Sequence, residues 1–258
     1  MSKKQYYSDD ERIIRVWDIE TVKDLMARRQ VMNMNNDRRR ELDTLWVTEE
    51  KYRRTASLGS NWGYYVGMDS IEKYYVIDHE AKQYRDLEAI HSTDSSVAVN
   101  NLNLGWGTTA FHTVTTPMLY IAGDGMTARG LWYLAGQETI VKGDGTFTAY
   151  HTMGNMAADF VKENGVWKIW HQVICNDFIV EAGTDFKTGS LEPLTEEDPF
   201  REDFGTPDIP MVVHNPRYNL SDNYPPMPLP YDSYTIAGSM EPAGHPNYKQ
   251  YLKEAGKR

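Results

Sequence analysis

Two histidines in strand-like segments are the residues of this chain best placed to do chemistry. His112 lies near the start of FHTVTTPMLYIAGDGMTARGLWYL, and His171 lies inside AADFVKENGVWKIWHQVICNDF. An imidazole has an ordinary pKa of about 6.5, so it can accept or donate a proton near neutral pH. Apolar surroundings favour its neutral form, which can act as a base. The pattern therefore predicts general acid–base catalysis, with His112 as the base.

Two predicted β-hairpins hold these rings. Asn164-Gly165 separates two alternating apolar runs, and this pair favours a type I′ turn because both central residues need positive φ. Strand alternation places His171 on the face of Trp167, which we expect to point toward the core. We therefore expect His171 and His112 to converge on one pocket. The alternative for each ring is a structural role, held in the core by one hydrogen bond.

Aromatic residues supply further candidates for the site. The glycine-rich joint SNWGYYVGMDS carries Trp62, Tyr64 and Tyr65 near the expected pocket mouth. The phenol of Tyr65 could donate to a substrate oxygen where negative charge develops. Trp132 could form a stacking wall for an aromatic substrate, and Tyr120 shares a strand face with His112. Core packing is the alternative for each of these aromatic rings.

Other common catalytic chemistries lack their motifs. The histidines form no His-x3-His pair, so we expect no metal site. The segment GDGMTARG precedes a strand rather than a helix, which does not suit a phosphate site. No Gly-x-Ser-x-Gly elbow is present. Cys175 is the only cysteine, which excludes an internal disulfide, and its apolar strand predicts a buried, unreactive thiol.

Helices precede strands along the chain. Apolar spacing predicts helices from Asp18 to about Asn33 with Asp18 as the cap, from Asp37 to Trp46, and from Asp69 or Ser70 toward Ile90. From about Ala110 to Val180 the period changes to two, with turns at 123–125, 143–145 and 164–165. This order predicts an α+β domain in which four strands form a meander and the helices pack on one face.

The strand that begins at Thr127 is apolar on both faces. Such a strand needs a cover on each side, which predicts helices on one side and often a second subunit on the other. We therefore expect a homo-oligomer, a dimer or trimer. Beyond about Pro193 the chain is rich in proline, tyrosine and acidic residues without a sustained period. We interpret this part as an extended arm over the domain or a neighbouring subunit, ending in a short helix.

Composition narrows the set of partners. The net charge of −10 and the pI near 5.2 argue against nucleic acid, which needs a basic surface. The one basic run, 38–40, is bracketed by acids, which is typical of a solvated helix face. No stretch has the length of a membrane span, and the polar start does not resemble a signal peptide. We expect a cytoplasmic protein.

The sequence resembles the SnoaL-like branch of the nuclear-transport-factor-two-like superfamily over about residues 15 to 180. The motifs that carry the resemblance are GMDSIEKYYV, the turn at 164–169, and a set in the first hairpin made of His112, Pro117, Gly123, Asp124 and Ala128. The resemblance implies a cone: N-terminal helices packed in the concave face of a strongly curved, mostly antiparallel sheet, with a deep pocket between them. Most enzymes of this superfamily need no cofactor.

The resemblance also implies roles for particular residues. In dehydratase-like members a histidine at the place of His112 is the general acid or base, helped by a tyrosine and an aspartate from the helices. Asp37 is the nearest acid here and becomes the orienting residue or second acid. The usual strand tyrosine before the second hairpin is replaced by Met156. The predicted site thus has His112, His171, Tyr65 and Asp37 as catalytic residues and Trp62, Tyr64, Trp132, Tyr120 and Met156 as substrate-binding residues.

These observations together predict a cofactor-independent lyase, dehydratase or isomerase. It would act by proton transfer on a hydrophobic, oxygenated aromatic or polycyclic small molecule, including the formaldehyde-releasing lyase reaction on lignin-derived diaryl compounds. The alternatives are a binding or assembly module on the same fold, and oxygenase chemistry, which no iron-ligand pattern supports. The predicted organisation is an N-terminal arm at 1–14, the cone domain at 15–185 and the C-terminal extension at 186–258.

Overall fold

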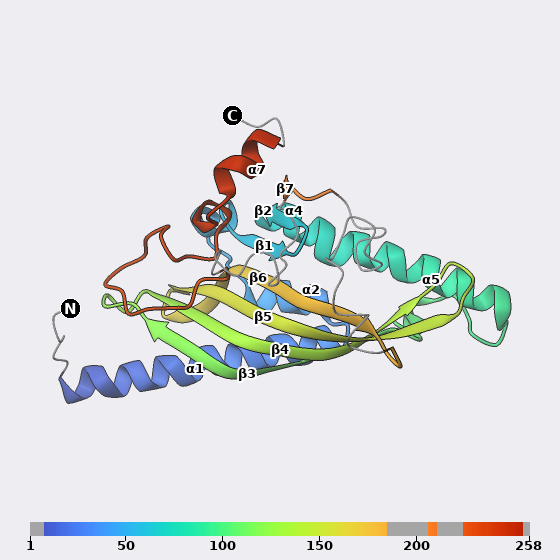
Figure 1. Ribbon diagram of the computed structural model, residues 1–258. Coiled ribbons are helices and arrows are strands. Elements are labelled where there is room, and N and C mark those ends of the chain that lie inside the picture. The colour runs from blue at the N-terminus through green and yellow to red at the C-terminus, as the bar shows by residue number, and fades with distance from the viewer. Residues whose placement is uncertain (1–7, 185–205, 211–223, 255–258) are drawn as a thin grey trace.

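In the computed structural model (Figure 1), the described residues are 8–184, 206–210 and 224–254. Helices come first: α1 (Asp9–Met34), α2 (Arg38–Leu45) and α3 (Glu50–Arg53). A hairpin of β1 (Ser57–Ser60) and β2 (Gly63–Val66) precedes a continuous helical segment of α4 (Met68–Glu72), a π-helical stretch (Lys73–Asp78) and α5 (His79–Thr93). A 3-10 turn (Asn101–Asn103) leads to β3 (Thr109–Ile121), β4 (Thr127–Val141), β5 (Phe147–Glu163) and β6 (Val166–Glu181). The C-terminal part contains β7 (Ile209–Pro210), a 3-10 turn (Pro242–Gly244) and α7 (Tyr248–Glu254).

One seven-stranded sheet contains all these strands, in the order β3-β4-β5-β6-β1-β2-β7. Neighbouring strands are antiparallel except β1 and β6, which are parallel. Figure 1 shows that the four long strands curve, with α1 lying along them. In the Asn164-Gly165 turn, φ is positive at both residues, 49° and 83°, as the type I′ prediction requires. The predicted α+β class and the four-strand meander are confirmed.

The predicted start of α1 is wrong. The helix begins at Asp9, where Ser8 forms a capping box: its Oγ accepts from the N–H of Glu11, and the Glu11 carboxylate accepts from Ser8 N. The first turns expose apolar side chains such as Trp17, which is 75% exposed, so no amphipathic pattern marks them. Asp18 is not a cap but a buried anchor that accepts hydrogen bonds from Lys162 Nζ and Trp167 Nε1, both at 2.8 Å.

Two further local predictions also need correction. The third helical segment begins at Met68, after Gly67 with φ of 84°, rather than at a cap formed by Asp69 or Ser70. The glycine-rich joint LGSNWGYYVGM is the β1-β2 hairpin. Each of its strands has four residues, too few to show a period.

The sheet is covered on both faces. On the inner face, Met26 of α1 and Leu42 of α2 pack with Trp132 and Phe160 of the strands. Full burial of each such side chain contributes about 1.5–3 kcal/mol. On the outer face, described parts of the C-terminal segment form a second cluster with the sheet, made of Leu131, Ala157, Val173, Cys175, Ile209, Tyr224 and Met240 among others. The thiol of Cys175 is fully buried, as predicted.

Backbone hydrogen bonds also tie the C-terminal segment to the sheet. Tyr231 O accepts from Gly123 N at 2.8 Å, and Met240 N donates to Asp159 Oδ2 at 2.7 Å. The Arg129 guanidinium donates to the carbonyl oxygens of Thr235 and Ala237. This segment therefore covers part of the outer face that the sequence assigned to a further partner.

The homo-oligomer stays a prediction. Beyond the reach of the C-terminal cluster, the outer face of the long strands exposes Phe111, Tyr133 and Met153, which are 45%, 57% and 49% exposed. Within the described residues, none of the helices has the length and apolar character needed to cross a bilayer.

Met240→Ala should lower the free energy of unfolding by about 2–5 kcal/mol, because the side chain is fully buried against the outer face and its loss leaves a cavity. Urea denaturation measures the change. Met227→Ala is the matched control, since Met227 lies in the same segment but is 60% exposed. Equal stabilities of the two variants would show that the segment does not contribute to the folded core.

Candidate active site

A cavity of about 400 Å³ opens between the helices and the inner face of the sheet. Its sheet wall comes from β3, β4 and β6, and its helical wall from the end of α1, the start of α2, the π-helical stretch and α5. The β1-β2 turn and the segment before β3 complete it. The lining combines aromatic and apolar side chains with many polar ones. The cavity is therefore more polar than the predicted set of aromatic and apolar substrate-binding residues implied.

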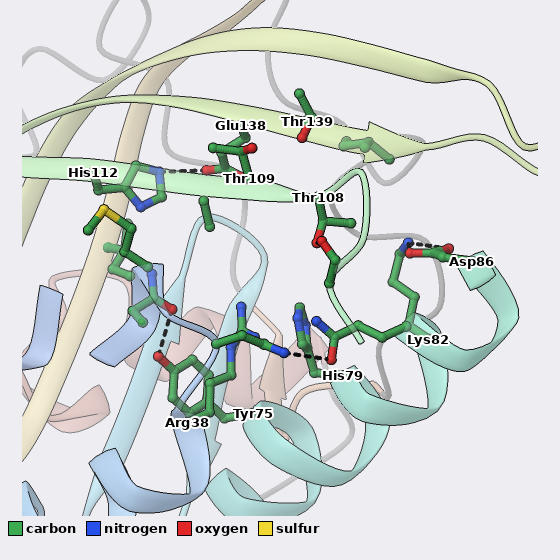
Figure 2. Close-up of a pocket in the computed structure, with 18 of the residues that line it drawn as sticks. Arg38, Tyr75, His79, Lys82, Asp86, Thr108, Thr109, His112, Glu138 and Thr139 are labelled. Carbon is green, nitrogen blue, oxygen red and sulfur yellow. Dashed lines mark hydrogen bonds and ion pairs between the residues drawn. The ribbon is translucent and has the colours of Figure 1, made fainter. Parts of the chain in front are cut away.

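On the sheet wall, His112 and Glu138 form a hydrogen-bonded pair. Nε2 of His112 lies 2.7 Å from Oε1 of Glu138, and the two side chains are 11% and 19% exposed. Because a carboxylate can only accept, Nε2 carries the hydrogen, which leaves Nδ1 of the neutral ring as the acceptor. Figure 2 shows this second ring nitrogen facing the helical wall. The arrangement can take a proton from a molecule in the cavity.

Gly136 makes room for this pair. It lies opposite His112 in the β3-β4 ladder, and a Cβ built on it would lie 2.1 Å from Cδ2 of the imidazole. Such a distance is far below van der Waals contact, so any side chain here would displace the ring. Glycine at this position is therefore part of the site.

Facing this pair, the helical wall carries Arg38, Tyr75, His79 and the ion pair of Lys82 with Asp86, whose Nζ–Oδ2 distance is 2.8 Å (Figure 2). Arg38 donates to Oδ1 of Asn36, and its guanidinium carbon lies 5.3 Å from the centroid of the Tyr75 ring. Burial, with the charges of Arg38 and Lys82, holds the pKa of His79 well below its usual value, so this imidazole is neutral.

A buried polar network fixes Tyr75 in the helical wall. Its hydroxyl lies 2.8 Å from Oε2 of Glu41 and 2.9 Å from Oδ1 of Asn33, while Arg29 forms a buried ion pair with Glu41 at 3.3 Å. Burial raises the pKa of the Tyr75 phenol far above its ordinary value, so it stays protonated. These buried contacts keep this wall rigid.

Several polar atoms at the cavity have no partner within the part of the chain that the structure describes. These buried atoms are Nε of Arg38, Oγ of Ser60, Nε1 of Trp62 and Oδ1 of Asn176. All four residues line the cavity. Since leaving a buried donor or acceptor unpaired costs about 1–3 kcal/mol, their grouping here is typical of a binding site.

Of the nine residues predicted for the site, His112 and Trp62 line the cavity. The prediction that His171 converges with His112 is wrong. The β5-β6 ladder shifts register between Asp159 and Phe160, which leaves Trp170 as an extra residue. This bulge reverses the alternation, so that Trp167 and Ile169 face the helices while Val173 and Cys175, with His171, face the C-terminal segment.

His171 lies in a second polar cluster on the outer face. The ring is fully buried, with Nδ1 2.9 Å from Ser57 Oγ and Nε2 3.8 Å from Glu241 Oε2. Burial lowers the pKa of His171 to about 3, so it is neutral. In the same cluster, burial raises the pKa of Asp159 to about 7 despite the nearby Arg129. These groups hold the C-terminal segment in place.

The remaining catalytic predictions fall outside the cavity. Tyr65 is 3% exposed in the core, where its ring stacks on Tyr74 at 3.8 Å between centroids. Asp37 precedes α2 and pairs with Arg40 at 3.6 Å on the surface. Asp37 lies one position from Asn36 and Arg38, which line the cavity, because local spacing alone does not determine which side of a chain reversal faces inward.

The other predicted binding residues are core or surface residues. Tyr64 packs in the outer-face cluster, Trp132 packs edge-on against Phe160, and Met156 is fully buried. Tyr120 is 38% exposed toward the end of β3 and does not line the cavity. Trp132 is therefore a core residue, which was the alternative to a stacking wall for the substrate.

Two cavity residues, Glu138 and Arg38, are not among those predicted from the sequence. Continuing the alternation of β4 past Trp132 and Leu134 places Glu138 on the inner face, a signal that was present in the strand pattern. Arg39 pairs with Glu72 and Arg40 with Asp37, as a solvated face predicts, but Arg38 lines the cavity. No grouping of three or more potential metal ligands occurs among the described residues.

Comparison of the sequence with protein-family models and with curated proteins finds no match. Among solved structures, hexachlorocyclohexane dehydrochlorinase LinA type 3 from Novosphingobium barchaimii LL02 is 15% identical, with a TM-score of 0.45 over 69% of this chain and 98% of that chain. An NTF2-like protein with a cystatin-like fold from Novosphingobium aromaticivorans is 16% identical, with a TM-score of 0.42 over 71% of this chain and 94% of that chain. At such identities and scores the matches concern the fold alone.

Gly136→Ala should break the His112–Glu138 hydrogen bond, because the added methyl group occupies the place of the imidazole. Imidazole ¹⁵N NMR measures this change: the Nε2 chemical shift of His112 should move away from the value of a ring that is hydrogen-bonded to a carboxylate. Gly143→Ala is the control, since a Cβ there meets nothing within 4 Å. An unchanged His112 signal in Gly136→Ala would contradict the assigned geometry.

Asp159→Asn should make stability more sensitive to acid. A carboxyl whose folded pKa is about 7 contributes stability below its unfolded pKa of about 3.9, and this contribution is lost as the pH rises through 7. His171, with a folded pKa of about 3, contributes in the opposite sense, because its stability is lost as the pH falls below about 6.5. The two contributions oppose each other between about pH 4 and 6.5.

Without the Asp159 carboxyl, the free energy of unfolding should fall by up to about 1.4 kcal/mol more per pH unit on acidification than in the wild type. Urea denaturation across this pH range measures the two slopes. Parallel slopes would show that Asp159 does not hold a proton in the folded protein.

Proposed function

We propose that this protein is a cofactor-independent lyase, dehydratase or isomerase in which His112 transfers a proton. The observation that carries the proposal is the 2.7 Å contact of His112 Nε2 with Glu138 Oε1 on the wall of a 400 Å³ cavity. Two ionisable groups that converge in a cavity are the arrangement expected of an acid–base catalyst.

In this mechanism His112 is the base and Glu138 orients it. Glu138 accepts the hydrogen bond from Nε2–H, fixes the tautomer and orientation of the ring, and stabilises the imidazolium once Nδ1 has taken a proton from carbon. A positioned base of this kind accelerates a reaction by roughly 10²–10⁴-fold. Glu138 therefore takes the orienting role that the sequence gave to Asp37.

Unpaired donors at the cavity suit the substrate oxygen. Nε1 of Trp62 is a buried N–H without a partner among the described residues, and Oγ of Ser60 in the same turn is likewise unpaired. Either group could donate to a carbonyl or leaving hydroxyl as negative charge develops, which is the function predicted for the phenol of Tyr65. In the proposed site, the β1-β2 turn thus provides the electrophilic contacts.

The lining indicates the class of substrate. Trp62, Tyr74, Ile140 and Ile174 offer aromatic and apolar surface, while the polar atoms call for oxygen substituents. An oxygenated aromatic small molecule meets both requirements. Loss of water, isomerisation and formaldehyde release from a diaryl compound all begin with a proton transfer that this dyad could perform.

A binding module without turnover is the second candidate. It is favoured by the positions of His171, Tyr65 and Asp37, which all lie outside the cavity. The measurement below separates the two candidates, because binding alone does not depend on a base.

His112→Ala should lower the rate of water elimination from 4-hydroxy-4-phenylbutan-2-one by roughly a hundredfold or more, because the base that removes the C3 proton is lost. Formation of the enone by absorbance, and solvent deuterium incorporation at C3 by mass spectrometry, measure the step. The thermal midpoint should stay nearly unchanged, and His151→Ala on β5, outside the cavity, should retain the wild-type rate.

Equal rates for the wild type and His112→Ala would instead identify a binding module. A variant that unfolds would show that the imidazole is structural.

A further inference from the structure

Arg38 brings to the cavity a positive charge that has no carboxylate partner among the described residues. It is the first residue of α2 and lines the helical wall. Within the described part of the chain it forms no ion pair with a carboxylate, and its buried Nε–H has no hydrogen-bond acceptor. By contrast, its neighbours Arg39 and Arg40 are both paired with acids at the surface.

The other charges of the helical wall are already compensated. Lys82 pairs with Asp86 there, whereas the Glu138 carboxylate lies on the sheet wall, where it accepts a hydrogen bond from the neutral ring of His112. His79 adds no charge, because burial and the two nearby cations hold its pKa well below the usual value. Arg38 is therefore the one charged group of the helical wall that lacks an ion-pair partner among the described residues.

Arg38 is also held in a fixed orientation. Its guanidinium donates to Oδ1 of Asn36 and lies over the ring of Tyr75, which the buried hydrogen bonds to Glu41 and Asn33 keep in place. A pre-oriented guanidinium loses less entropy when it binds a ligand. Its remaining N–H groups are available in the planar arrangement that matches a carboxylate.

We propose that Arg38 binds the carboxylate of the substrate, so that the protein acts on an oxygenated aromatic monoacid whose reacting carbon lies near His112. This inference rests on the proposed function and adds its substrate class. Figure 2 shows Arg38 in the helical wall and His112 in the sheet wall across the cavity. A ligand that spans the cavity would then present its acid group and its reacting group to opposite walls.

The cations of the helical wall favour a carboxylate over a phosphate. A carboxylate carries one negative charge, which the single guanidinium of Arg38 can match. A phosphate dianion would bring a second negative charge, and the remaining cation, Lys82, already has a carboxylate within 2.8 Å. The overall charge of −10 opposes any anion at long range, but salt screens exposed charges beyond about 8–10 Å, so the local guanidinium decides binding.

The test compares two probes of the same shape, 3-phenylpropanoate and 3-phenylpropanamide, by isothermal titration calorimetry with the full chain. Wild-type protein should bind the carboxylate at least tenfold more tightly than the amide, as expected for a charge-assisted bidentate contact. Arg38→Gln should abolish this preference, and Arg38→Lys should keep part of it because the charge remains without the planar fork. Arg39→Gln, at the adjacent exposed position, should behave like the wild type.

Other outcomes would overturn the inference. A wild type that binds the amide as tightly as the acid would refute a carboxylate site, and this comparison needs no variant to fold. Retention of the preference in Arg38→Gln would assign the carboxylate to another residue. Competition by inorganic phosphate as strong as that of the probe itself would make phosphate the occupant.

Failure of this inference is distinguishable from failure of the proposed function. His112→Gln should keep the acid-over-amide preference while losing turnover, since the ring does not contact the carboxylate in the proposed pose. If Arg38→Gln leaves the preference intact while His112→Ala still abolishes elimination, the lyase proposal stands and the substrate class is wrong.

Discussion

Burial of both faces of the long strands is the constraint on which the rest of this structure depends. The inner face carries Trp132 and Phe160, and the outer face carries Leu131 and Val173. Because both faces bear large apolar side chains, each of them needs a cover that shields these side chains from water. The helices cover the inner face but leave a cavity at one end, and the C-terminal segment covers part of the outer face. Where the inner cover is incomplete, the polar side chains His112, Glu138 and Arg38 gather.

Buried polar groups lie in three places with different chemistry. Behind the helical wall, Glu41 forms an ion pair with Arg29 and a hydrogen bond with Tyr75, which gives rigidity rather than reactivity. On the outer face, burial keeps His171 neutral and raises the pKa of Asp159 to about 7, and both residues join the C-terminal segment to the sheet. At the cavity, four buried polar atoms without a partner among the described residues belong to side chains that line one chamber, and this grouping favours a ligand site there.

One inserted residue in β6 separates the expected site from the observed one. Regular alternation would place the side chain of His171 on the same face as Trp167, but the bulge at Trp170 places it on the opposite face. The residue types near Trp170 do not predict a bulge, because the bulge depends on how β6 pairs with β5 and β1. The same limit applies to Arg38 and Asp37, where one position at a chain reversal decides between cavity and solvent.

Local patterns were sufficient for much of the fold. The period-two runs and the Asn164-Gly165 turn determined the meander, and the helical spacing determined most of α1 and α2. These features depend on residues close together in the sequence. Tertiary structure alone decided that Glu138 meets His112, that Gly136 leaves room for the ring, and that Arg38 faces them, because each depends on registers and packing between elements distant in the chain.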